Sequence, residues 1–481
     1  MKRIAVLGAI AVLASMLTVR ASVGRRSTGQ NPSQPQTQSP NQNQNPTQNQ
    51  PQTQNPNQTQ HPNQNPTQSP NQNQTTTPPA TATPPATATQ PPATPAPPVQ
   101  EQQSGPILIG GQAPVILTRQ RSLDANKPQF LQAVMLPGAG MNLFQLKAYI
   151  PGKGDIDLIS TTDLATAAPL LNSLATGSQP ANSTLAMGAP FFVPFAGLIR
   201  GTVSPDGKTI GTVVDGHRAW LPANWHSPDA PAEAASVNGL IGASQFRVLS
   251  QRNAADKSTV FTTLRAGNFG NQWFSNTDIT IGATLKDDSL DLYVMAKNAG
   301  DVEDPLGIGF MPYFLIPSGD RLQARLTIPG DMRVLVRNHQ NDFPTGRIVS
   351  VKGSAYDFTS PVGISLGNLS LDECFTDLQR GDSQKNTDEQ DNDNQSSNTN
   401  NEIVQLIDPA ARYGLRMRIL SQHIKAIQVY APADKNFVAI GPQFNLPDPY
   451  SRVWRGQDTG MVLLQQGRSV VWYVRLELFT P

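Results

Sequence analysis

The alternation of apolar and polar residues from Gly105 onward limits the fold of this chain more than any other feature. Apolar side chains occupy every second position in five clear stretches: "MNLFQLKAYI" (141–150), "TDITIGATL" (277–285), "LDLYVMAK" (290–297), "RLQARLTI" (321–328) and "IKAIQVYAP" (424–432). A period of two is typical of strands that bury one face. Long helical patterns are scarce, and Gly and Pro recur every few residues. The sequence therefore predicts an all-β fold, a large antiparallel β-sandwich over residues 105–481.

Two segments within this region have special composition. The chain ends in "GMVLLQQGRSVVWYVRLELF" (460–479), two apolar runs around a Gln-Gln-Gly turn, which predicts a β-hairpin. Residues 379–401 are polar throughout and predict a disordered surface loop inserted into the domain. The Asp-rich part of this loop lacks the glycine and the terminal glutamate of a calcium-binding loop, so we expect no calcium site there.

The N-terminal part of the chain predicts export. Lys2 and Arg3 precede an uncharged apolar run that ends at Val19, and small residues follow it. We interpret residues 1–21 as a signal peptide, with a retained membrane anchor as the alternative. Residues 22–104 consist almost wholly of Gln, Asn, Pro, Thr and Ala, which predicts a disordered linker. The expected location is secreted, periplasmic or on the cell envelope.

Charge and residue usage exclude several classes of function. The formal net charge is +1, so neither nucleic acid nor an anionic membrane surface is an expected partner. Cys374 is the single cysteine, so no internal disulfide can form. Of the five histidines only His217 and His226 are close in sequence, and their spacing is weak evidence for a metal site. We expect no metal, no cofactor, no membrane contact beyond the signal segment, and a monomer.

Six short segments, taken in order, resemble the aldose 1-epimerase (galactose mutarotase-like) family. They are "PFAGLIRG" (194–201), "SVNGLIGAS" (236–244), "GIGFMPYFLIP" (307–317), "LDECFTDL" (371–378), "QVYAPADKNFVAIGPQFNLPDPY" (428–450) and "DTGMVLLQQGRSVVWYVRLEL" (458–478). The resemblance extends from about Gly110 to the C-terminus. It implies the fold of that family, a large antiparallel β-sandwich, in agreement with the strand pattern.

The resemblance also implies a degenerate active site. In active members a histidine before Pro-Tyr-Phe protonates the ring oxygen of the sugar, and a glutamate before another proline removes the proton of the anomeric hydroxyl. Met311 stands at the histidine position and Gly441 at the glutamate position. Neither residue can carry a proton, and positioned acid or base groups each contribute about 10²–10⁴ in rate.

Other positions of the family site have changed as well. Gly197 and Leu198 stand at an Asn-Arg pair, and Asn238 stands at a histidine that contacts substrate in the family. Asp372 remains at the position of an aspartate that hydrogen-bonds sugar hydroxyls. Our candidate substrate-binding residues are Asp372, Asn238, Tyr313 and Gln443.

Aromatic residues near these segments have two interpretations. Tyr313, Phe314, Phe444 and Trp454 could line a cleft and stack on sugar rings. For at least two of them we expect simple burial instead.

Three hypotheses of function follow. The first is an exported carbohydrate-binding protein of this family without epimerase activity. The second is an active aldose 1-epimerase that uses relocated proton carriers, for which Glu373, Asp448 and His423 are the candidates. The third is a structural module of the cell envelope. Packing of Leu198 against Met311 in a filled cleft, and backbone donors saturating Asp372, would favour the third.

Overall fold

The computed structural model describes residues 105–481 except 176–186, 228–232, 340–341 and 380–402. The expected signal peptide (1–21) and linker (22–104) lie outside the described residues. So does the polar insertion (379–401) apart from Gln379, whose backbone N–H donates to the Pro329 carbonyl at 2.7 Å. No helix in the described part of the chain is long and apolar enough to cross a membrane.

The two largest sheets contain nine and eight strands, and every strand pairing among the described residues is antiparallel. The order in the nine-stranded sheet is β11 (Arg247–Asn253), β12 (Ser258–Gly267), β13 (Thr277–Leu285), β14 (Ser289–Asn298), β28 (Ser469–Phe479), β24 (Tyr413–Ile419), β23 (Ile403–Asp408), β18 (Arg325–Thr327) and β21 (Ile364–Ser365). The order in the eight-stranded sheet is β20 (Pro344–Ser350), β19 (Gly330–Val336), β22 (Leu371–Leu378), β25 (Ala426–Ala431), β26 (Phe437–Gln443), β16 (Gly309–Phe310) and β5 (Phe191–Phe192), and β17 (Tyr313–Leu315) also pairs with β26.

Three smaller sheets and a few helical turns complete the described fold. A four-stranded sheet contains β1 (Val115–Thr118), β2 (Gln129–Leu136), β3 (Asn142–Ile150) and β4 (Gly154–Asp157). A five-stranded sheet has the order β8 (His217–Pro222), β7 (Thr209–Val214), β6 (Leu198–Val203), β10 (Ala234–Val237) and β9 (Trp225–His226), and β15 (Asp304–Leu306) pairs with β27 (Val462–Leu464). The helical elements are α2 (Leu164–Ala175), η1 (Pro137–Ala139), η3 (Pro409–Ala411) and η4 (Arg452–Trp454).

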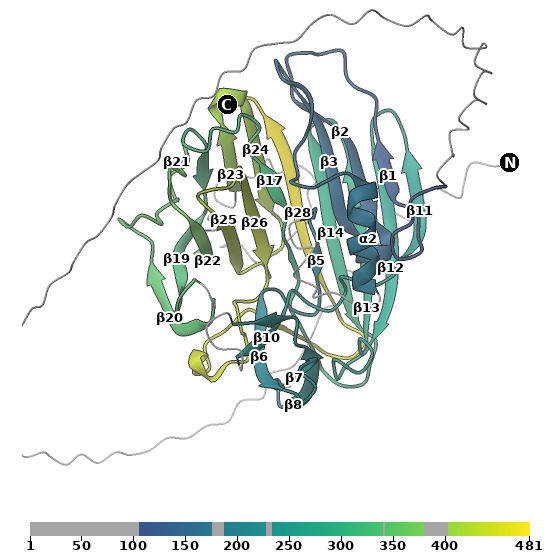
Figure 1. Ribbon diagram of the computed structural model, residues 1–481, viewed down its shortest axis with the longest axis vertical. Coiled ribbons are helices and arrows are strands. Elements are labelled where there is room, and N and C mark those ends of the chain that lie inside the picture. Colours follow the sequence, from purple (N-terminus) through teal and green to yellow (C-terminus); the bar gives the residue numbers. More distant parts are fainter. Residues whose placement is uncertain (1–104, 176–186, 228–232, 340–341, 380–402) are drawn as a thin grey trace, which may run out of the picture. The chain divides into compact units, whose positions relative to one another are not determined.

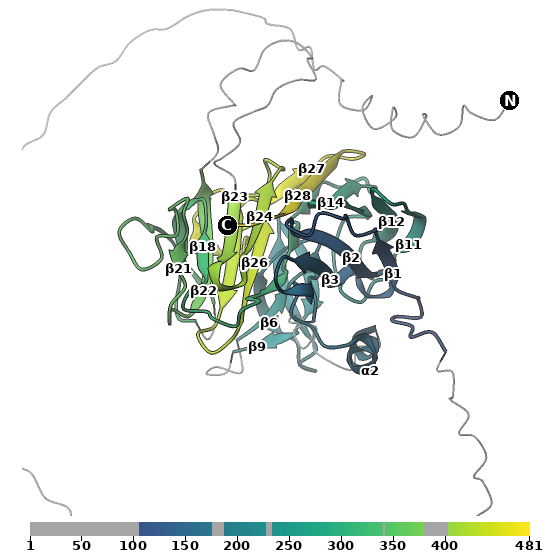
Figure 2. The same ribbon diagram turned by 90° about the horizontal axis from the view of Figure 1, so that it is seen from above.

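The main core forms where the alternating strands bury their apolar faces against one another. In β14, Leu290, Leu292, Val294 and Ala296 are buried at every second position, as the sequence pattern predicts. They belong to one continuous cluster with residues of β2, β3, β22, β25 and β26. Figure 1 shows β22, β25 and β26 on one side of β28 and β14, and Figure 2 shows β22, β26, β28 and β14 from above. The predicted antiparallel β-sandwich is confirmed.

Two local predictions were wrong. The expected C-terminal hairpin does not pair with itself: β27 pairs with β15, while β28 lies between β14 and β24. The eleven residues of β28 bury alternate apolar side chains in the large sheet, which fixes their partners more strongly than the short turn does. Within "RLQARLTI" only Arg325–Thr327 is a strand, because residues 321–323 form a turn and Asp320 accepts from the Gln323 N–H at 3.3 Å.

Candidate functional site

The candidate site lies on one side of the eight-stranded sheet. On β22, β25 and β26, alternate residues point into the main core, for example Phe375, Val429 and Ile440. The residues between them project to the opposite side, because successive side chains of a strand alternate. We call this side the site face and define it by Asp372, Gln428, Tyr430, Ala439 and Gly441. The register pairs Asp372 with Tyr430 and Gln428 with Gly441.

Met311 lies directly over Gly441. A Cβ built on Gly441 would be 2.5 Å from the Met311 sulfur and 3.5 Å from the Gln428 Cβ. Real carbon atoms are not found so close, so a side chain at position 441 would require the flexible Met311 thioether to shift. The φ of Gly441 is not positive, so the backbone conformation at this position does not require a glycine. The structure thus places Met311 and Gly441, which the sequence resemblance sets at the acid and base positions, next to each other, and neither has a titratable group.

The surroundings of Met311 are apolar. Met311 is 9% exposed and packs with Phe192, Ala196, Tyr313 and Ala439. The Met311 N–H donates to the Pro190 carbonyl at 3.1 Å, which anchors the segment between β16 and β17. The thioether therefore fills this part of the site as a flexible apolar group.

Asp372 differs from this apolar part because it belongs to a pair of carboxyl groups. Its Oδ1 accepts a hydrogen bond from Gln428 Nε2 at 2.8 Å. Its carboxyl group also hydrogen-bonds that of Asp342, which lies between β19 and β20 with a φ of 49°. Burial and then the charge of Asp342 raise the pKa of Asp372 to about 8, while burial raises the pKa of Asp342 to about 6. Two adjacent carboxyl groups resist ionising together, so this pair keeps a proton to a higher pH than two separate aspartates would.

Tyr313 and Tyr430 give the site face its aromatic part. Tyr313 is buried, and its ring contacts those of Tyr430 and Phe437 at centroid distances of 6.4 and 5.2 Å. Burial raises the pKa of the Tyr313 hydroxyl, followed by the charges of Tyr430 and Asp372. Tyr430 is only partly buried and is the more accessible ring.

The other aromatic candidates are core residues. Phe314 and Phe444 belong to the main core, and Trp454 packs in a separate buried cluster with Cys374 and Leu446. The expectation that at least two of the four candidates serve packing is confirmed.

The hydrogen bonds of Gln443 and Asn238 are made to residues other than the carboxyl pair. Gln443 is buried, and its Nε2 donates to the Asn445 carbonyl at 2.7 Å. The half-buried Asn238 has a φ of 60°, and its N–H donates to the Gly197 carbonyl at 2.7 Å. A role of either Gln443 or Asn238 in substrate binding remains a prediction.

Leu198 and Met311 belong to different buried clusters. Leu198 packs with Ala235, Val237 and Phe343, against which Trp225 also lies. One of the two features expected for a purely structural module is therefore missing. The second is missing as well, since the Asp372 carboxyl interacts with the side chains of Gln428 and Asp342 and not with backbone donors among the described residues.

The three candidates for relocated proton carriers are not gathered near Met311. Glu373 forms a buried ion pair with Arg333 at 2.6 Å. Asp448 forms an ion pair with Arg200, also at 2.6 Å. The ring of His423 lies against Phe444 at a centroid distance of 5.6 Å. The residue that sequence reasoning missed is Asp342, which stands in an irregular loop with no motif to mark it.

No group of three or more metal-ligating side chains is present among the described residues. His217 is exposed and stacks on Phe274 at a centroid distance of 4.2 Å. His226 is exposed on β9.

An antiparallel β-sandwich with one nine-stranded and one eight-stranded sheet defines the class of this protein. The family model for aldose 1-epimerase matches residues 169–476, and the chain belongs to that family. A search of curated protein sequences finds no match.

Solved structures of similar fold support the assignment of the fold. A galactose mutarotase-like protein from Clostridium acetobutylicum shares 16% identity, covers 76% of this chain and 98% of its own, and has a TM-score of 0.53. The GalM/aldose epimerase homologue of Caenorhabditis elegans shares 16% identity over 76% of this chain and 99% of its own, with a TM-score of 0.52. A putative aldose 1-epimerase from Escherichia coli K12 shares 14% identity over 77% and 100%, with a TM-score of 0.50.

Proposed function

We propose that this protein binds carbohydrate on the site face and lacks epimerase activity. The observation that carries the proposal is the position of the Met311 sulfur over Gly441. This contact fills the place of the family acid and base with atoms that cannot transfer a proton. The retained Asp372 and its neighbours supply the polar part of the proposed site.

The polar and aromatic groups of the site face suit a saccharide. Asp372 and Gln428 offer a carboxyl group and an amide held 2.8 Å apart, which can contact neighbouring hydroxyls of one sugar. Tyr430, directly opposite Asp372 in the register, adds a ring and a hydroxyl. Binding sites for small ligands commonly combine a few positioned polar groups with an apolar and aromatic lining.

Calorimetric titration with D-galactose, D-glucose and short oligosaccharides tests this proposal. Gln428→Ala removes the amide beside Asp372 and should weaken binding about tenfold or more, because a hydrogen bond to a charged or shared-proton carboxyl is lost. The matched control is Gln405→Ala, a half-buried strand glutamine of the other large sheet. Absence of binding to every neutral saccharide, or equal affinities for both variants, would contradict the proposal.

A second function is favoured by one observation, the Asp342–Asp372 pair. Anomer interconversion needs one group that donates a proton and one that accepts it. Two carboxyls that share a proton provide both between their two titration steps. In this alternative the protein accelerates mutarotation with a pH dependence set by the pair. Asp342→Asn and Asp372→Asn should each abolish that acceleration in a polarimetric assay.

We also propose that the protein is exported, an inference supported by the sequence of its first 104 residues alone. Cell fractionation followed by N-terminal sequencing tests it. The expected result is a product outside the cytoplasm that begins near residue 22. A product that retains Met1 and stays in the cytoplasm would contradict it.

A further inference from the structure

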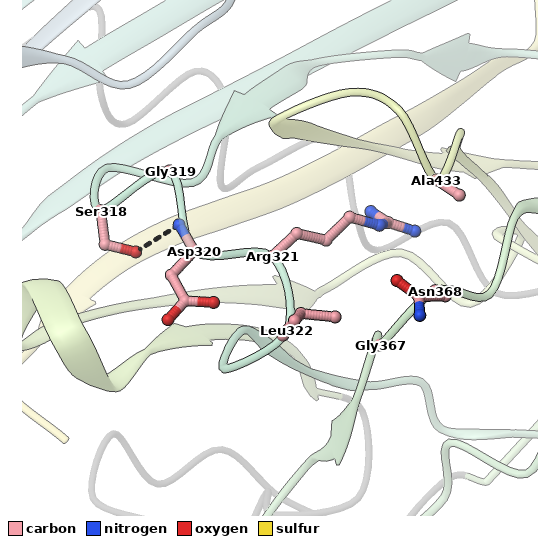
Figure 3. A pocket seen from close by; sticks show the side chains of 8 residues that line it. All are labelled: Ser318, Gly319, Asp320, Arg321, Leu322, Gly367, Asn368 and Ala433. Carbon is pink, nitrogen blue, oxygen red and sulfur yellow. Dashed lines mark hydrogen bonds between the residues drawn. The ribbon is translucent and has the colours of Figure 1, made fainter.

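A pocket separate from the site face lies where β22 begins and β25 ends. Its volume is about 430 Å³, and its lining includes Ser318, Asp320, Arg321, Asn368 and Ala433. Figure 3 shows these side chains around the turn that follows β17. None of them belongs to the residues that define the site face, and only Ala433 lies within a segment that carries the family resemblance (428–450).

Arg321 is the unusual residue of this pocket. It is 6% exposed, and its Nη2 donates to the carbonyls of Leu369 and Ala431 at 2.5 and 2.8 Å. Its Nε and Nη1 are buried without a hydrogen-bond partner, and within the described residues no carboxylate forms an ion pair with it. Asp434, the acid that acts on it through charge, is itself paired with Lys435 at 3.0 Å. Burying a guanidinium that has two unpaired N–H groups and no anion in contact with it costs free energy of folding. A bound anionic ligand would offset that cost.

The arrangement of the lining favours a single negative charge. Figure 3 shows the Asp320 carboxylate pointing away from the Arg321 guanidinium, while Asn368 lies on the guanidinium side. One arginine with Asp320 and Asp434 nearby suits a carboxylate better than a dianion, since each further negative charge would be repelled by these acids. A planar carboxylate also matches the fork of donors of a guanidinium.

We infer that this pocket is a second ligand site, which binds a sugar that carries one carboxylate, such as a uronic acid. The carboxylate lies at the end formed by Arg321 and Asn368. The hydroxyls of the sugar face Ser318 and Asp320. The saccharide nature of the ligand rests on the proposed function, whereas its charge rests on Arg321.

The two unpaired nitrogens are covered by neighbouring atoms, so an anion contacts them only after a small shift of the lining. We therefore expect binding to depend strongly on the charge of Arg321 and to weaken as salt concentration rises.

Calorimetric titration of the full chain with D-glucuronate and D-galacturonate tests the inference. D-Glucose and D-galactose serve as neutral probes, and acetate tests the carboxylate alone. Arg321→Gln should lower uronate affinity about 10–100-fold, because a hydrogen-bonded charge is lost. This variant also removes the side chain that donates to the Leu369 and Ala431 carbonyls, which affects folding as well.

A second variant, Asn368→Asp, avoids this problem because Asn368 is exposed. It should weaken uronate binding about tenfold, because the added carboxylate repels that of the ligand. Asn126→Asp, on an exposed turn in the loop before β2, is its matched control.

The outcomes separate this inference from the proposed function. Uronate binding that is weakened by Asn368→Asp but not by Asn126→Asp or Gln428→Ala supports a second site. Uronates that bind no better than neutral sugars overturn it, even if neutral sugars bind the site face. Acetate binding as tightly as the uronates overturns the assignment of a sugar ligand. Uronate affinity unchanged in folded Arg321→Gln overturns the role of the arginine.

Discussion

The sulfur of Met311 occupies the space in which a side chain at Gly441 would begin, 2.5 Å from the position of its Cβ. The sequence resemblance sets the two residues at the positions of the family acid and base, and their contact links the two positions physically. The present position of the Met311 sulfur is compatible with glycine at 441 and not with a residue that has a Cβ. A glutamate at 441 could not enter this space without displacing the thioether.

We predict that Gly441→Ala destabilises the protein by about 1–3 kcal/mol, because the added methyl group overpacks a filled site. In a Met311→Ala background the same substitution should cost less, since the thioether no longer opposes it. The difference, a coupling of at least about 0.5 kcal/mol, is measured by urea unfolding of the four proteins. Gly242→Ala serves as control, because no atom lies within 4 Å of its Cβ. Additive costs of the two substitutions would contradict the contact.

The Asp342–Asp372 pair predicts a pH dependence of stability. Both carboxyl groups have pKa values raised above that of an unfolded aspartate, so the folded state binds more protons between about pH 4 and pH 8. The free energy of unfolding should therefore fall as the pH rises through this range. Asp304, with a pKa raised by burial to about 6, contributes in the same direction.

Asp372→Asn should flatten this dependence and raise stability at pH 8 by on the order of 1 kcal/mol or more. The asparagine keeps the shape of the side chain and can still bond Gln428. Urea unfolding at pH 5.5 and pH 8 measures the effect, with the exposed Asp256→Asn as control. An equal slope in the wild type and in Asp372→Asn would mean that the two carboxyls do not share a proton.

The ion pair between Arg333 and Glu373 predicts a large loss of stability when one partner is removed. The Glu373 side chain is 1% exposed and lies 2.6 Å from the guanidinium. Arg333→Met should cost about 3–5 kcal/mol at pH 7, because the buried carboxylate loses its hydrogen-bonded partner and keeps only His339, whose Nε2 lies 3.4 Å away. Burial already raises the pKa of Glu373 and Arg333 opposes that shift, so the cost should be smaller at pH 5. Thermal unfolding at both pH values measures this, and a cost independent of pH would contradict the explanation.

Much of the architecture could be predicted from the sequence, because half-buried antiparallel strands impose a period of two that is visible in β3, β13 and β14. Partners of short strands could not be predicted in the same way. The pairing of β27 with β15 depends on residues more than a hundred positions apart, and the local turn suggested a different neighbour.

The candidate site, like the fold, could be predicted only in part. The resemblance placed Met311 and Gly441 at the acid and base positions, and the structure adds that they touch. Asp342 was not predictable, because an aspartate in an irregular loop gains its role only when the fold brings it to Asp372. Arg321 lay in a pattern that predicted a strand, whereas it lines a pocket from a turn.

The central claim, that the site face has lost the proton-transfer chemistry of its family, is tested most directly by polarimetry of freshly dissolved α-D-galactose with the purified protein. The account predicts a mutarotation rate equal to that of buffer at every protein concentration. A rate that rises in proportion to protein concentration, and that Asp372→Asn abolishes, would contradict the claim and identify the carboxyl pair as the proton carrier.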